Sequence, residues 1–311
     1  MSTAFYSHPE CRLHDMGRGH PECPERLGAI DDHLLATGLD VALDRRDAPL
    51  AELSDLKLAH SANYVENLRD SLQRLAACGE SRALDPDTLA CPGTWQAALR
   101  AAGAAVAATD AVIDGEVQNA FCSVRPPGHH ATRDETMGFC FFNNVAVAAR
   151  HALDVRGLQR VAIVDFDVHH GNGTEDIIAG DERVLMASIF QHPLYPGSGA
   201  VPKGTNMVNL PIPPYTRGME IREMIEAMWM PRLEQFKPQM FFVSAGFDAH
   251  REDDLGQLGL VEADYEWITL RIKSMAERHA QGRIVSCLEG GYNLSALARS
   301  VATHLRVLAG V

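Results

Sequence analysis

Strand-like and helix-like patterns alternate along most of the chain. From residue 94 onward, apolar positions at helical spacing alternate with short β-branched runs typical of strands that are buried on both faces. The pattern predicts helices at 95–113, 143–152, 174–178, 219–236, 262–279 and 294–308. It predicts strands at 120–124, 161–164, 184–189, 207–210, 240–244 and 284–288. Such alternation forms βαβ units, so we expect an α/β fold with a mainly parallel sheet and helices on both faces.

The N-terminal third has a weaker pattern. It predicts a short strand at 4–7, helices at 27–35 and 64–75, and between the helices a connection at 50–59 that contains a short helical piece. Residues 78–92 are rich in Gly, Asp, Pro and Ser and predict a long loop, which in a compact domain is often functional. Asp85 and Asp87 on this loop are candidates for the rim of a site for a cationic substrate. Since no repeat, linker or low-complexity tract divides the sequence, we expect a single domain over residues 1–311.

The composition narrows the class of partner. The hydrophobic fraction of 46% and the charged fraction of 22% are typical of a soluble globular protein. The formal net charge is −13, and nucleic-acid binding requires clustered Lys and Arg, so we expect no nucleic-acid partner. An acidic surface would instead attract cationic substrates such as polyamines or Lys-rich peptides.

The cysteines and the N-terminus indicate a compartment. The seven cysteines are odd in number and scattered, and they contain no Cys-x-x-Cys pair, which is typical of reduced thiols. Residues 1–11 lack the pattern of a signal peptide. The Ala-rich run at 97–113 is interrupted by polar residues and predicts a buried helix, not a membrane span. We therefore expect a cytoplasmic protein with no membrane partner, and an oligomer is compatible with the sequence.

The densest group of polar residues follows the strand predicted at 161–164. Asp165, Asp167 and His169 occupy alternate positions of an extended segment, so their side chains fall on one face. Ligands bind at the carboxyl ends of strands in open α/β sheets, and buried carboxylates and imidazoles are unfavourable unless they are paired. We interpret the segment as a cation site. The alternative is that the two aspartates cap the next helix and His169 is an unrelated loop residue.

Three other predicted strands also end in polar groups, which favours the cation site. The strings RPPGHH, AGFD and EGGY follow the strands expected at 120–124, 240–244 and 284–288. Parallel strands end at one edge of the sheet, so residues far apart in sequence share one site. Asp167, His169 and Asp248 then offer three protein ligands and leave a fourth position for water, as in catalytic zinc sites. The mixed oxygen and nitrogen donors suit Zn²⁺, and they also suit Fe²⁺ or Co²⁺.

The same strand ends supply acid–base groups. Of the neighbours His129 and His130, a neutral imidazole can take a proton from water, and a protonated one can pass a proton to a leaving amine. Asp165 is a charged acceptor for one ring and Asn172 a neutral acceptor for the other, which makes the two proton affinities differ. The Tyr292 phenol can donate to a developing oxyanion. Taken alone, a His pair or a Gly-Gly-Tyr turn is often structural, so the interpretation depends on all the groups meeting.

Five motifs together resemble the zinc-dependent histone deacetylase superfamily, which has the three-layer arginase/deacetylase fold. They are RPPGHHA from Arg125, GFCFFNNVAVAA from Gly138, VDFDVHHGNGT from Val164, SAGFDAH from Ser244 and LEGGYN from Leu288. The string GHPECPERL near the N-terminus also matches, so the resemblance covers nearly the whole chain. The motifs look most like those of class II deacetylases and their bacterial relatives, including the acetylpolyamine amidohydrolases.

The resemblance implies a role for each motif residue. The zinc ligands would be Asp167, His169 and Asp248. The catalytic residues would be His129 and His130 as the general acid/base pair, Asp165 and Asn172 as their respective partners, and Tyr292 as the phenol that polarises the carbonyl.

The resemblance also implies sites around the metal. The narrow acyl-lysine tunnel would be lined by Gly138, Phe139, Tyr195 and Leu255. A structural K⁺ would be held by Asp165, the backbone carbonyls of Asp167 and His169, and the segment containing Ser188 and Ile189, with the Ser188 hydroxyl as a ligand. Arg26 would lie near an inner cavity below the metal.

Three positions depart from the family's usual pattern. Asn172 stands where class I enzymes carry Asp, which fits class II. Tyr195 occupies a tunnel position that is usually Phe and adds a hydroxyl group. The string REDDLG from Arg251 replaces the Gly-Asp-Pro-Leu-Gly type of class II enzymes, so we expect a different rim there.

These observations predict a zinc-dependent amidohydrolase that removes an acetyl or other short acyl group from an amine, either an acyl-lysine or an acylated small amine. One alternative is an acetylpolyamine-specific amidohydrolase. Another is a binuclear manganese ureohydrolase, whose Asp-x-His-x-Asp pattern is interrupted here because Gly171 stands two residues after His169. A third is a non-catalytic acyl-lysine binding protein, which is disfavoured because every expected catalytic position is filled.

Overall fold

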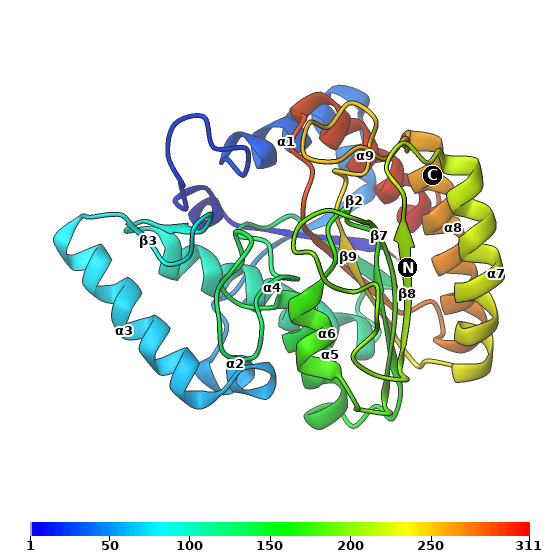
Figure 1. The fold of residues 1–311 in the computed structure, drawn as a ribbon, viewed down its shortest axis with the longest axis horizontal. Helices are drawn as coiled ribbons and strands as arrows, with labels where there is room; N and C mark the ends of the chain where they lie inside the picture. The colour runs from blue at the N-terminus through cyan, green and yellow to red at the C-terminus, as the bar shows by residue number, and fades with distance from the viewer. Residues whose placement is uncertain (1) are drawn as a thin grey trace.

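A parallel β-sheet forms the middle layer of the structure, a computed structural model that describes residues 2–311 (Figure 1). Its eight strands have the order β2-β1-β5-β10-β9-β6-β7-β8, and all neighbours run parallel. Their bounds are β1 Thr3–Ser7, β2 Leu43–Asp47, β5 Asn119–Cys122, β6 Val161–Asp165, β7 Val184–Gln191, β8 Met207–Ile212, β9 Phe241–Ala245 and β10 Ile284–Leu288. The predicted α/β class with a parallel sheet is confirmed.

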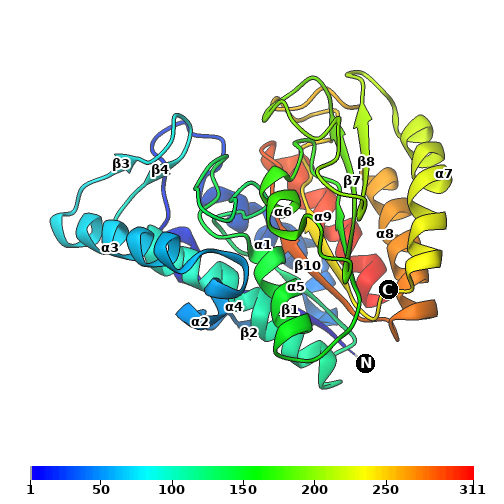
Figure 2. The same ribbon diagram turned by 60° about the horizontal axis from the view of Figure 1, so that its bottom comes forward.

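Helices cover both faces of the sheet (Figures 1 and 2). One layer packs together α1 Glu25–Thr37, α7 Gly218–Phe236, α8 Glu262–His279 and α9 Leu294–Ala309. The other contains α2 Leu53–Ala59, α3 Ala62–Cys78, α4 Thr94–Ile113, α5 Asn144–Asp154 and α6 Asn172–Ile178. Side-chain caps explain several boundaries, since Ser61, Asn143 and Asn293 accept hydrogen bonds from backbone N–H groups in the first turns of α3, α5 and α9.

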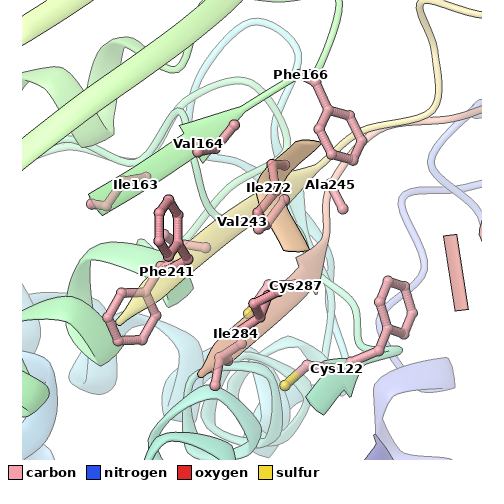
Figure 3. Packing of buried hydrophobic residues seen from close by; sticks show 14 of the residues in the cluster. Cys122, Ile163, Val164, Phe166, Phe241, Val243, Ala245, Ile272, Ile284 and Cys287 are labelled. Carbon is pink, nitrogen blue, oxygen red and sulfur yellow. The ribbon is translucent and has the colours of Figure 1, made fainter. Parts of the chain in front are cut away.

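The core lies between the sheet and its two helix layers. Strands β5, β6, β7, β9 and β10 are buried along their whole length, as expected for parallel strands with helices on both sides. Figure 3 shows part of this cluster, with labelled side chains from β5, β6, β9 and β10. Each large apolar side chain that is fully buried contributes ~1.5–3 kcal/mol relative to exposure. This packing fixes the strand ends that carry the polar motifs.

Two features differ from the sequence prediction. Strand β2 was not predicted because its sequence, LDRRD, has no apolar run; it lies at the sheet edge, pairs only with β1 and leaves its charged side chains partly exposed. The predicted loop at 78–92 contains a short antiparallel pair, β3 Arg82–Ala83 with β4 Leu89–Ala90. Short 3₁₀ turns at Pro9–Arg12 and Leu39–Ala42 complete the N-terminal part.

Candidate active site

The polar motifs meet at the carboxyl ends of four strands that are neighbours in the sheet, in the order β5, β10, β9 and β6. Asp167 and His169 follow β6, and Asp248 follows β9. One potential ligand atom from each of these three residues lies within 4.8 Å of the others. Asp248 thus meets His169 across 79 positions of sequence, as the topology predicts.

His169 stands between the two carboxylates. Its Nδ1 atom lies 3.1 Å from Asp167 Oδ1 and 3.1 Å from Asp248 Oδ2, and all three residues are buried. The Gly290 backbone N–H donates to Asp167 Oδ2 at 2.8 Å. A Cβ atom on Gly246 would lie 2.0 Å from Asp167 Oδ2, and one on Gly290 would lie 2.0 Å from Asp248 Oδ2. Both positions therefore require glycine so that the backbone can approach the carboxylates.

The electrostatics of this cluster fit a divalent cation. Burial, with the neighbouring charge of Asp167, raises the pKa of Asp248 to about 7. Burial disfavours the charged form of His169, but its hydrogen bonds to Asp167 and Asp248 outweigh this effect and raise its pKa to about 10. The two buried carboxylates of Asp167 and Asp248 carry more negative charge than the single His169 ring can neutralise. A cation that accepts oxygen and nitrogen ligands would satisfy all three groups.

His129 and His130 have different partners, as predicted. His129 Nδ1 lies 3.0 Å from Asp165 Oδ2, and His130 Nδ1 lies 2.8 Å from Asn172 Oδ1. The two ring centroids are 4.0 Å apart. Each Nδ1 is thereby engaged, which leaves Nε2 of each ring as the atom available for proton transfer.

The surroundings split the proton affinities of the two histidines. Burial would lower the pKa of His129, but the carboxylates of Asp167 and Asp165 raise it well above its usual value. Burial and the positive charges of His129 and His169 lower the pKa of His130 well below its usual value. In the metal-free protein at neutral pH, the pair therefore consists of a protonated His129 and a neutral His130.

A cavity of about 270 Å³ opens beside the cluster. Its lining residues are Asp87, His130, Gly138, Phe139, His169, Leu194, Tyr195, Leu255 and Tyr292. The lining includes all four residues expected along the tunnel. Of the two candidates on the rim loop, Asp87 lines the cavity and Asp85 does not. The Tyr195 ring packs edge-on against His130 at 5.2 Å between centroids, and Phe139 packs against Tyr292 at 6.1 Å.

The wall formed by Gly138 and Phe139 has an unusual backbone. Both residues have positive φ angles, 56° and 69° respectively. A Cβ atom on Gly138 would lie 2.4 Å from the ring of His130, so glycine is required there. A bulky residue in the left-handed region is strained by ~1–3 kcal/mol and is commonly held in place at functional sites. The Phe139 N–H donates to Thr88 Oγ1 at 3.0 Å, which ties this wall to the rim loop.

Arg26 lies directly behind Tyr292. It is fully buried, its guanidinium carbon is 5.1 Å from the Tyr292 ring centroid, and its Nε donates to Gly291 O at 2.7 Å. Nη1 donates to Glu22 Oε1 at 3.1 Å. Burial would raise the pKa of Glu22, but Arg125 and Arg26 lower it to about 2, so this carboxylate stays charged. The role of Arg26 at an inner cavity stays a prediction.

Glu289 is a site residue that sequence reasoning did not single out. Its carboxylate is fully buried and accepts hydrogen bonds from the backbone N–H groups of Gly128 at 2.6 Å and His129 at 3.1 Å. The Ser244 hydroxyl donates to its other oxygen at 3.1 Å. Burial raises the pKa of Glu289 to about 7. This one side chain joins the ends of β5, β9 and β10, a role that no local pattern reveals.

A Glu289→Ala variant is expected to lose more than about 3 kcal/mol of unfolding free energy, because three buried donors lose their acceptor at ~1–3 kcal/mol each. A Glu289→Gln variant is the matched control. Its amide oxygen can still accept from both backbone groups and its NH₂ can donate to Ser244, so it should stay within about 1 kcal/mol of the unmodified protein. Urea unfolding monitored by circular dichroism measures both, and equal losses in the two variants would contradict the assignment.

Comparison with known proteins places the chain in a family. The family profile described as Histone deacetylase domain matches residues 20–308, so the chain belongs to this family and is a hydrolase of the deacetylase and amidohydrolase class. It is 39% identical over 282 residues to the histone deacetylase-like amidohydrolase of Pseudomonas aeruginosa, covering 88% of this chain and 73% of that protein. It is 37% identical over 302 residues to a probable deacetylase of Archaeoglobus fulgidus, covering 94% and 82% respectively.

The fold agrees with this assignment. The crystal structure of the HDA15 HD domain superposes with a TM-score of 0.92 at 32% sequence identity and covers 99% of this chain and 88% of that one. The resemblance predicted from the motifs is therefore confirmed. No helix within residues 2–311 has both the length and the apolar character needed to cross a membrane.

Proposed function

We propose that the protein is a zinc-dependent amidohydrolase that removes an acetyl or another short acyl group from an acylated amine. The observation that carries this proposal is the buried cluster of Asp167, His169 and Asp248 beside a cavity that also exposes His130 and Tyr292. Zn²⁺ suits this donor set, and Fe²⁺ or Co²⁺ would also suit it. When bound, such an ion supplies polarisation of the amide carbonyl and a water molecule of lowered pKa.

His130 is the residue we assign to proton abstraction from water. It lines the cavity, and its lowered pKa keeps the ring neutral and able to accept a proton. His129 lies behind it, and Asp165 holds its Nδ1–H. Since the pKa of His129 is raised, its ring stays protonated and stabilises negative charge that develops on the substrate. The proton taken by His130 is then available to the leaving amine.

Tyr292 is the residue we assign to the carbonyl oxygen. Its phenol lies on the cavity wall, and its backbone N–H donates to Asp253 Oδ2 at 2.6 Å, which fixes the Gly-Gly-Tyr turn. Phe139, Leu194 and Leu255 give the cavity apolar surface suited to the alkyl chain of an acylated amine.

A structural K⁺ beside β6 and β7 is also proposed. Ser188 is paired with Asp165 in the strand register, and its hydroxyl is buried without a hydrogen-bond partner within residues 2–311. A monovalent cation held by Asp165, this hydroxyl and the carbonyls of Asp167 and His169 would supply the missing partner. Ile189, the next residue of β7, is buried beside it.

The cavity favours an acyl-lysine over an acylpolyamine. A polyamine carries further ammonium groups along its chain, but Asp87 is the single carboxylate among the lining residues, and Leu255 is apolar. The seven cysteines are free thiols, which supports our proposal of a reducing compartment such as the cytoplasm.

The manganese alternative is disfavoured because a Cβ atom on Gly171 would lie 2.3 Å from Asp165 Oδ2, so no side-chain ligand fits there.

The test is a panel of substrates with protein of measured metal content. Zinc-loaded protein is expected to hydrolyse an acetyl-lysine peptide with a higher kcat/KM than acetylputrescine, and longer acyl chains should be slower because the cavity is small. A chelator should abolish the activity and added Zn²⁺ should restore it. The proposal fails if the zinc-loaded protein hydrolyses none of these amides, and two bound Mn²⁺ per chain would favour the ureohydrolase.

A further inference from the structure

A second cavity adjoins the catalytic one. We call it the rim groove; it has a volume of about 700 Å³ and is lined by Tyr215, Arg217, Arg251 and residues 256–259. Leu255 lines the catalytic cavity, and the next residue along the chain begins the floor of the rim groove. Since consecutive Cα atoms are ~3.8 Å apart, this one segment borders both the catalytic cavity and the groove.

The walls of the rim groove are fixed by backbone hydrogen bonds. Tyr215 N donates to Gln257 O at 2.7 Å, and Gly259 N donates to Thr216 O at 2.9 Å. Arg251 N donates to Leu260 O at 2.9 Å. The first two bonds join the segment after β8 to the segment after β9, and the third closes the segment after β9 on itself, so the groove is a formed feature of the fold.

The floor of the groove also rests on the metal-binding segment. A Cβ atom on Gly256 would lie 2.7 Å from Val168 Cγ2 and 2.8 Å from Asp248 O, so the backbone packs tightly there. The position of the rim groove is therefore set by the same residues that position the cluster.

The charge of the groove is opposite to that of the molecule as a whole. Arg217 and Arg251 line it, and no Asp or Glu does, although the chain carries a formal net charge of −13. Nearby arginines are neutralised, because Arg222 pairs with Asp264 and Arg299 pairs with two glutamates. Within residues 2–311, by contrast, neither groove guanidinium has an ion-pair or hydrogen-bond partner. Two unpaired guanidinium groups at one concave surface favour a carboxylate ligand, which each can bind in a bidentate manner.

Tyr215 adds an aromatic surface to the groove. Its side chain is 74% exposed, and its φ angle of 68° places it in the left-handed region, where a bulky residue is strained. A ring that is this exposed contributes little to the packing of the core. It offers a flat surface for the aliphatic or backbone part of a ligand whose carboxylate the arginines hold.

We propose that the rim groove binds a carboxylate on the amine portion of the acylated substrate. Such a carboxylate is present in an acyl-lysine peptide with an acidic residue beside the acylated lysine, and also as the α-carboxylate of free acyl-lysine. This inference rests on the proposed function and narrows its substrate class. Acylpolyamines, which have no carboxylate, would gain nothing from the groove.

The test uses an Arg217→Ala/Arg251→Ala variant of the zinc-loaded full chain. The substrates are free Nε-acetyl-lysine, the same compound capped at both the amine and the carboxylate, and acetyl-lysine peptides flanked by Glu or by Lys. For carboxylate-bearing substrates we expect kcat/KM to fall about tenfold in the variant, mainly through KM, as for loss of a charge-assisted contact. The capped and Lys-flanked substrates should change less than about twofold.

The matched control is an Arg74→Ala/Arg306→Ala variant, which removes the same charge from exposed positions on α3 and α9. It should leave every rate near that of the unmodified protein. Preference for free acetyl-lysine would identify the α-carboxylate as the ligand, and preference for the Glu-flanked peptide would identify an acidic side chain.

Two results would overturn the inference and leave the proposed function intact. One is equal kcat/KM for the capped and carboxylate-bearing substrates in the unmodified protein. The other is an equal loss in the control variant, which would show a long-range charge effect. Failure of the zinc-loaded protein to hydrolyse any of the four substrates would instead refute the proposed function itself.

Discussion

A Tyr292→Phe variant is expected to hydrolyse an acetyl-lysine substrate with a kcat ~10²–10³-fold below that of the unmodified protein, the usual result of removing one oxyanion donor. Burial and the negative charges of Asp248 and Asp167 raise the pKa of Tyr292 well above its usual value. The phenol therefore keeps its proton throughout the working pH range and remains a donor. KM should change little, because the interaction strengthens only as charge develops on the carbonyl oxygen.

A tyrosine outside the cavity provides the matched control for this experiment. Tyr265 is fully buried in the core, and its hydroxyl has no hydrogen-bond partner within residues 2–311. A Tyr265→Phe variant removes the same atom from a residue that does not line the cavity, keeps the ring that packs against Phe166 and Phe247, and should retain full activity. The zinc content of both variants should equal that of the unmodified protein. A Tyr292→Phe variant with full zinc and a near-normal rate would exclude the assigned role.

An Asp248→Ala variant is expected to lose both zinc binding and measurable activity. Only Asp167 and His169 remain as protein ligands, and the site has lost one of its two negative charges. The readout that does not depend on catalysis is thermal unfolding. Zinc at 100 times its Kd stabilises the folded state by ~2.7 kcal/mol, which at ~1.5 °C per kcal/mol for a chain of 311 residues raises Tm by about 4 °C. The unmodified protein should show this rise and the variant should not.

The zinc affinity of the unmodified protein should also depend on pH. Zinc binds the deprotonated carboxylate, and in the metal-free protein burial and Asp167 raise the pKa of Asp248 to about 7. His169, whose pKa is about 10, must also lose a proton to bind zinc, so protons compete over the whole range and more strongly below about pH 7, where Asp248 is protonated too. The affinity should therefore decrease as the pH falls. Titration with a zinc-buffering chelator from pH 8 to pH 5.5 measures this. An affinity that stays constant over this range, or an Asp248→Ala variant that still gains stability from zinc, would contradict the ligand assignment.

The sequence was sufficient to predict the arrangement of the site for a physical reason. Parallel strands end at one edge, so runs of buried residues that stop at polar groups already imply that the groups meet. Asp167, Asp248 and Tyr292 were placed together by this rule alone. The helix and strand positions from residue 94 onward were predicted within a few residues, because strands buried on both faces carry a strong apolar signal.

What the sequence did not predict depends on contacts between segments with no signal of their own. Strand β2 consists largely of charged residues and is recognisable only by its pairing with β1. Glu289 is one acidic residue among many until Gly128 and Ser244 are seen beside it. The rim groove arises from two loops joined by the bridge between Arg217 and Gly259, a contact across 42 positions that no periodicity encodes.

The position of β10 has a consequence for how this enzyme becomes active during synthesis. Although it is the last strand in the chain, β10 lies in the interior of the sheet between β5 and β9. A nascent polypeptide that ends before residue 284 holds two partial sheets, β2-β1-β5 and β9-β6-β7-β8, with no strand to join them. Synthesis must therefore pass β10 before the two partial sheets can join and bring the polar motifs together.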